Sequence, residues 1–169
     1  MSAALAFWRR WRFHLSALAV LVPVGFAPDY FQRLAMDAGS VGLGARVIGV
    51  HAVGDWTVKL AEFDLGPPAI EGEAGPVKLF TLALDGPARD EVKAAYIKIG
   101  KPRSIRSAGA LFAGTPYRQT AGLQVPPTAT AASEVWLTLE GWDGSVSQSM
   151  LPLSEASPAT ADWLRRAGT

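Results

Sequence analysis

Few side chains in this sequence can carry out chemistry, and they are scattered along it. Cysteine is absent, which excludes disulfides, a thiolate nucleophile and cysteine-ligated metals. The two histidines, His14 and His51, do not lie near a GxSxG-type turn, so no serine has an evident general base. The residue types therefore predict no catalytic site and a protein that is not an enzyme.

Potential metal ligands are equally dispersed. No HxxxH, HxH or MxxM spacing occurs, which leaves a site assembled from His51, Met150 and a carboxylate as the alternative to no metal at all. We predict no metal and no cofactor. The neighbouring carboxylates are interpreted as solubilising groups on strands and loops: Glu62 and Asp64, Glu71 and Glu73, and Asp90 and Glu91.

The element that places the rest of the chain is an uncharged apolar stretch at residues 13–28. As a helix it would rise about 24 Å, short of the hydrocarbon core of about 30 Å, and extending it from Trp11 to Phe31 closes the gap. We predict a transmembrane anchor at residues 13–36, with the basic residues 1–12 in the cytoplasm. The residues expected at the membrane interfaces are Trp8, Arg9, Arg10, Trp11, Arg12, Tyr30 and Phe31.

Three other interpretations of this region stay open. A signal peptide cut after Ala27 has the same flanks, although Pro28 would follow the cut and resist cleavage. The paired arginines also occur in twin-arginine export signals. A second membrane span within residues 30–54 is disfavoured by Arg46 and by several glycines.

Beyond the anchor, the sequence predicts a mainly β domain. Its 17 glycines and 12 prolines favour short strands and many turns. Residues 37–54 are predicted to form a Gly/Ala-rich tether, of which 45–53 is either tether or a first strand. Residues 55–153 are predicted to form an immunoglobulin-like β-sandwich. Its expected strands are 55–65, 76–85, 92–99, 104–113, 117–125, 134–141 and 145–151.

Side-chain patterns add three local expectations. The alternation in the first strand changes phase, which predicts a bulge near Ala61. In the last strand, Val146 and Met150 are expected to point inward. Ser157 followed by Pro158 predicts the start of a short helix within the C-terminal segment 154–169.

Charge is segregated along the predicted domain. The charged residues of 55–91 are mostly acidic, whereas those of 92–133 are all basic. This segregation is typical either of solvated faces or of a positive surface for a partner or anionic lipid. Trp136 and Trp142 bracket the predicted hairpin, and they either fill the core or cover a sheet face, or they form an exposed aromatic patch. The predicted partner-binding residues are Lys98, Lys101, Arg103, Arg106, Trp136 and Trp142.

Two short motifs follow the anchor: Gly75-Pro76-Val77, leading into an apolar strand, and the turn Asp85-Gly86-Pro87. With the single predicted span, they make residues 13–152 resemble the FixH/YtkA-like group. The resemblance implies a single-span, periplasm-facing sandwich linked to the assembly of heme–copper oxidases and to copper transport. The chain departs from that group because it has no methionine-rich or histidine-bearing stretch for copper.

Together these observations predict a single-pass protein of the bacterial inner membrane with its C-terminal domain in the periplasm. The expected function is that of an accessory, assembly or small structural subunit of a respiratory or redox complex, acting by protein–protein contact. Its partners would be that larger complex and the lipid bilayer, and not nucleic acid. The alternative is a periplasmic ligand-binding or carrier module that uses the sandwich loops.

Overall fold

The computed structural model describes residues 3–37 and 42–167. The chain divides into two compact units, residues 1–36 and 37–169. The predicted N-terminal segment, tether and C-terminal tail each extend into residues outside the described ones, namely 1–2, 38–41 and 168–169.

The first unit is one long helix, α1 (Ala3–Asp37). Its window Arg10–Pro28 is long and apolar enough to cross a membrane, a property that membrane spans share with signal sequences. The predicted interface residues with described side chains are exposed on this helix, while the side chain of Arg9 lies outside the described set. The exposed ones are Trp8, Arg10, Trp11, Arg12, Tyr30 and Phe31.

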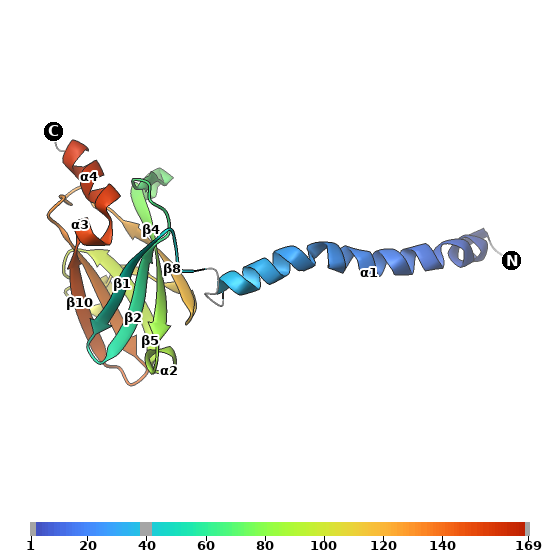
Figure 1. The fold of residues 1–169 in the computed structure, drawn as a ribbon, viewed down its shortest axis with the longest axis horizontal. Helices are drawn as coiled ribbons and strands as arrows, with labels where there is room; N and C mark the ends of the chain where they lie inside the picture. The colour runs from blue at the N-terminus through green and yellow to red at the C-terminus, as the bar shows by residue number, and fades with distance from the viewer. Residues whose placement is uncertain (1–2, 38–41, 168–169) are drawn as a thin grey trace. The chain divides into compact units, whose positions relative to one another are not determined.

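The second unit is mainly β and contains two antiparallel sheets (Figure 1). The larger, sheet A, has the order β1-β2-β4-β8-β7, with β3 also paired to β4. Its strands are β1 (Arg46–Val53), β2 (Trp56–Glu62), β3 (Ala69–Ile70), β4 (Pro76–Asp85), β7 (Ala113–Thr115) and β8 (Arg118–Gln124). The smaller, sheet B, has the order β10-β9-β5-β6. Its strands are β5 (Val92–Ile99), β6 (Ala110–Leu111), β9 (Glu134–Gly141) and β10 (Val146–Pro152).

Short helices lie at both ends of the sheets (Figure 1). Helix α2 (Ala88–Glu91) connects β4 to β5 at one end, and α3 (Leu153–Ala156) and α4 (Pro158–Ala167) follow β10 at the other. Two single turns of 3₁₀ helix complete the unit, η1 (Gly72–Ala74) and η2 (Ile105–Ser107).

One hydrophobic core joins the two sheets. Alternate residues of β2, β4 and β8 meet alternate residues of β5 and β9, as the period of two in a strand requires. Fully buried examples are Leu60 and Phe80 from sheet A and Ile97 and Leu137 from sheet B. In α4, Trp163 packs partly buried against the same core.

Strands with strong patterns form where they were predicted. The bounds of β4, β5 and β9 match the predicted strands 76–85, 92–99 and 134–141. Ala45–Val53, given as tether or strand, contributes β1. The predicted helix start is also confirmed, since the Ser157 hydroxyl accepts a hydrogen bond from the Thr160 N–H (3.3 Å).

The prediction for β10 was wrong. Val146 and Met150 point outward and are 49% and 47% exposed. Their register explains this, because β10 pairs Val146 with Glu140 and Met150 with Trp136, whereas Leu151 pairs with the fully buried Val135. Residues opposite each other in a ladder share a face, so the buried partner identifies Leu151 as the inward residue.

Two further local predictions need correction. The pairing of β2 with β4 is continuous through Ala61, and the irregularity lies instead in β1, between Val47 and Gly49. The predicted strand 104–113 is largely the turn η2 and the two-residue β6. After Phe112 the chain leaves sheet B and enters sheet A as β7, which explains why neither strand can be long.

A buried ion cluster at the α3 end of sheet A was not predicted. Glu62 is 1% exposed rather than solubilising, and it forms an ion pair with Arg46 (Nε–Oε2 2.6 Å). Lys78, also 1% exposed, places its ammonium 3.8 Å from the other Glu62 oxygen and 2.9 Å from Asp64. Arg46 additionally donates to the carbonyl of Ala156 in α3. The cluster therefore connects sheet A to the C-terminal helices.

Candidate protein-contact surface

The outward side of sheet B gathers most of the predicted partner-binding residues. The strand registers place Met150, Trp136 and Lys98 opposite one another in one row across β10, β9 and β5. The next rows are Gln148, Thr138 and Tyr96, and then Val146, Glu140 and Ala94. We call this surface, together with residues 100–107 that lie against it, the sheet-B face.

The basic segment packs onto this face instead of extending freely into solvent. The Lys98 ammonium donates to the Ser107 carbonyl at 3.0 Å, which holds the end of η2 against β5. Lys101 lies over the Trp136 ring, with its nitrogen 5.2 Å from the ring centroid. A cation over an indole is an attractive arrangement. The sequence thus named three groups that the structure brings together.

The middle of the face is covered while its margins stay open. Thr138 is fully buried although it points outward. Next to it, Arg103 and Ile105 line an open hollow of about 430 Å³ with Val146 and Gln148. Arg103 and Arg106 are exposed. The result is a mixed surface of apolar and cationic side chains, a composition that suits a protein interface.

One ion pair borders this face. The Lys93 ammonium lies 2.7 Å from Glu140, and this hydrogen bond, with the carboxylate charge, raises the pKa of Lys93 above its ordinary value. Tyr96 also donates to Glu140, at 3.4 Å. Glu140 is thus paired with its own neighbours, and a second carboxylate on this side, Glu134, accepts a hydrogen bond from the Trp136 indole at 3.1 Å. The cations of the face therefore outnumber its carboxylates.

Trp142 is not part of the sheet-B face. It follows β9, beyond the end opposite Trp136, and is 70% exposed. There it lines an open hollow of about 300 Å³ with Trp56, Asp90, Glu91 and Asp143. The Trp56 indole donates to Glu91 at 2.8 Å, and the pKa of Asp143 is lowered by its hydrogen bonds from the hydroxyl and N–H of Ser145. The surroundings of Trp142 are therefore acidic.

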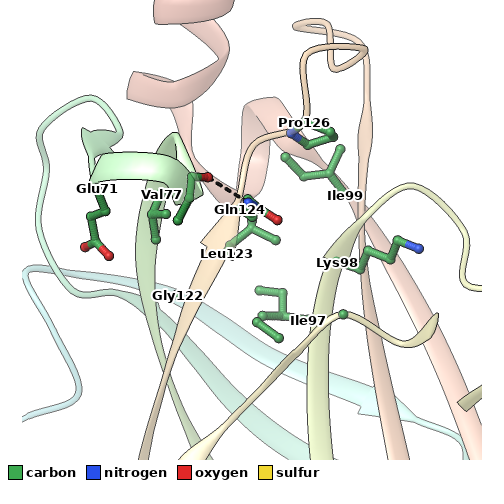
Figure 2. A pocket seen from close by; sticks show the side chains of 12 residues that line it. Glu71, Val77, Ile97, Lys98, Ile99, Gly122, Leu123, Gln124 and Pro126 are labelled. Atoms are coloured by element: carbon green, nitrogen blue, oxygen red, sulfur yellow. Dashed lines mark hydrogen bonds between the residues drawn. The ribbon is translucent and has the colours of Figure 1, made fainter. Parts of the chain in front are cut away.

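A second feature, an apolar cleft, was not foreseen from the sequence. It has a volume of about 600 Å³ and opens between β8 of sheet A and β5 of sheet B. Figure 2 shows Ile97, Ile99 and Leu123 pointing into it, with Glu71 on one wall and the Lys98 side chain directed away on the other. The Gln124 side chain donates to the Ala74 carbonyl at 2.7 Å and lies along the first wall.

Glycine is required at one point of the cleft wall. Gly109 has a φ of +106°, and a Cβ there would overlap the Ile97 carbonyl oxygen. Only glycine allows the chain to pass so close to β5 before it forms β6. In the sequence, the cleft was indicated only by the predicted strands 104–113 and 117–125, which contain several of its lining residues.

The structure does not bring His51 together with Met150. His51 lies on β1 opposite the buried Val58, hence on the inner side of sheet A, whereas Met150 is on the outer side of sheet B. The alternative metal site from these two residues is therefore wrong. Within residues 3–37 and 42–167, no three His, Cys, Asp or Glu side chains cluster to hold a metal. The side chain of His14 lies outside the described set.

The sequence matches the model of one protein family. The sequence model of a family described as uncharacterised conserved protein UCP029505 matches residues 7–154. The chain belongs to this family. The match covers the apolar window of α1 and both sheets, so UCP029505 combines these parts in one family unit. No curated protein and no solved structure matches the chain.

Proposed function

We propose that this protein is a membrane-anchored accessory, assembly or small structural subunit of a bacterial inner-membrane complex of the respiratory or redox type. In this proposal α1 is retained as a single membrane span, residues 1–12 are cytoplasmic and the β domain is periplasmic. The protein acts by contact and catalyses no reaction. The resemblance to the FixH/YtkA-like group is part of the same proposal.

The finer fold assignment is also proposed, as an immunoglobulin-like sandwich. The strand order supports it, because β2-β4-β8-β7 runs in the order A-B-E-D of that fold. In the second sheet β9 lies between β5 and β10, as strand F lies between C and G. Strand β1 would then be an addition outside strand A.

The observation that carries the contact function is the sheet-B face. Lys101 is fixed over Trp136, and the exposed Met150, Arg103 and Arg106 lie on the same side of the sheet or on the loop against it. Aromatic residues, methionine and arginine are enriched at protein interfaces. Exposed cations next to them would accelerate association with an acidic partner.

The test is site-directed photo-crosslinking in the native membrane. A photoreactive residue in place of Met150 should give a discrete crosslinked product that contains a second membrane protein, and one in place of Lys59 on sheet A should not. The product should disappear when Lys101→Glu and Arg103→Glu are combined with the probe at Met150. Crosslinks to lipid alone, or a single monodisperse species after mild-detergent purification, would contradict the proposal.

A ligand-binding or carrier module is the second candidate. The hollow between Trp56 and Trp142 favours it, since two indoles and three carboxylates border one opening of about 300 Å³. A screen of small organic cations by tryptophan fluorescence would test it, with Trp142→Ala as the matched variant. Saturable quenching that Trp142→Ala abolishes would support this function over the contact function.

A further inference from the structure

The apolar cleft lies against two strand edges that are only partly paired. On β8, the recorded pairing with β7 ends at Thr120 opposite Ala113, so Gly122 and Gln124 lie beyond it. On β5, pairing with β6 ends at Ile97 opposite Ala110, so Ile99 lies beyond it. Both unpaired ends line the cleft.

The direction of the backbone groups at these edges follows from the register. In an antiparallel ladder, successive residues direct their N–H and C=O groups to opposite neighbours. Val125 donates to the Pro76 carbonyl on β4, so odd-numbered residues of β8 face β4 and the even-numbered Gly122 and Gln124 face the other way. Within the described residues no strand pairs with those two on that side.

We propose that this edge and cleft form a strand-addition site that binds an extended segment of a partner protein. The added strand would lie along β8 in line with β7 and would exchange backbone hydrogen bonds with Gly122 and Gln124. Every second side chain would enter the cleft beside the accessible apolar part of its lining, Ala74, Ala110 and Pro126. This inference deepens the proposed contact function and rests on it.

The charged side chains that line the cleft are Glu71 and Lys98. Figure 2 shows Glu71 on one wall and the Lys98 side chain directed away from the cleft. The cations of the neighbouring loop lie instead on the sheet-B face, where Lys101 covers the Trp136 ring and Arg103 lines the hollow over β10. A segment with alternating apolar residues and a basic flank complements an apolar cleft beside a carboxylate. The partner is therefore expected to present an extended peptide with a basic residue beside Glu71, and not a helix.

The first test needs no ligand. In hydrogen exchange of the full-length chain in detergent micelles, the amides of Ala121 and Leu123, which face β4, should exchange at least about 100-fold more slowly than those of Gly122 and Gln124. Equal protection of all four amides would show that the edge is already paired and would overturn the proposal.

The second test uses a phage-displayed library of random octapeptides as the probe. Selected peptides should alternate apolar and polar residues with a basic flank, and they should slow exchange at Gly122 and Gln124. Their affinity for Ala74→Trp, which fills the cleft from an exposed position, should fall by about tenfold or more. The matched Ala132→Trp, exposed outside the cleft, should leave the affinity unchanged.

Peptides that bind Ala74→Trp as well as they bind the parent chain, or that lack alternation, would overturn the proposal. If Ala74→Trp perturbs folding, Gly122→Pro gives an independent check. That substitution removes an edge N–H and should also weaken binding. If Ala74→Trp keeps the Met150 crosslink, the contact function stands without strand addition. If peptides bind normally but no crosslink forms in membranes, the contact function fails, and the cleft is shown only to bind an extended peptide in solution.

Discussion

Replacing Lys78 with methionine should destabilise the β domain far more than any exposed lysine substitution. The Lys78 ammonium is buried and donates to the carbonyls of Asp64 (2.7 Å) and Gly66 (2.6 Å) as well as to the Asp64 carboxylate. It also lies 3.8 Å from Glu62. Lys78→Met leaves two carbonyls without this donor and takes one of the two cations from a buried carboxylate.

The magnitude follows from the burial of the cluster. Removing one partner of a buried ion pair costs about 3–5 kcal/mol, because the remaining charge cannot be solvated. Since domains are stable by only about 5–15 kcal/mol, this is a large fraction of the free energy of unfolding. For a unit of this size the midpoint of thermal unfolding should fall by roughly 10–20 °C.

Equilibrium urea unfolding of the full chain in detergent, followed by tryptophan fluorescence, would measure the loss. Lys59→Met is the matched control, since Lys59 pairs with Asp85 at 3.1 Å with a side chain that is 47% exposed. It should cost less than about 1 kcal/mol. Adding Glu62→Leu to Lys78→Met should cost less than the sum of the single changes. Equal losses for Lys78→Met and Lys59→Met would refute the reasoning.

Two further outcomes concern turns and helix ends. Because the Ser145 hydroxyl donates to Asp143 at 2.6 Å and lowers its pKa, Ser145→Ala should raise that pKa toward the ordinary 3.8, as measured by NMR titration. Because folding lowers the pKa of Asp143, the stabilisation of the folded state by these hydrogen bonds is complete above pH 3.8 and is lost as the pH falls through the pKa of the folded state. Ser145→Ala should reduce this loss of stability at low pH. Ser157→Ala removes the N-cap of α4 and should cost about 1 kcal/mol in the same urea assay, whereas Ser154→Ala, exposed in α3, should cost close to nothing.

The strands that could be predicted from the sequence are those whose own pattern determines their place. In β9, alternating Val135, Leu137 and Leu139 specify one buried face without reference to any neighbour. Strand β10 carries only one strongly buried apolar residue, Leu151, among small polar ones. Its inward face is therefore decided by its register with β9, and reading Val146 and Met150 as core residues from their hydrophobicity alone gave the wrong face.

The buried charges and the contact surface depend on pairings between distant residues. Glu62 resembles an ordinary strand-end carboxylate until β4 brings Lys78 beside it. The sequence predicted that aromatic and basic residues would form the contact surface. The placement of Lys101 over Trp136, however, requires β5 and β9 to be neighbours. Trp142 looked equivalent to Trp136 along the chain, yet it follows β9 beyond the other end and faces acidic groups.

The ion cluster and the cleft are also physically connected, which yields a last expectation. Lys78 pairs in register with Leu123 of the cleft floor, and its neighbour Val77 lines the wall. By holding β4 to the carbonyls of Asp64 and Gly66, Lys78 fixes the strand on which β8 is ordered. An added strand gains affinity when its template is ordered before binding. Lys78→Met should therefore weaken binding of the selected peptides even under conditions where the domain is fully folded, and unchanged affinity there would show that the cleft does not need this anchor.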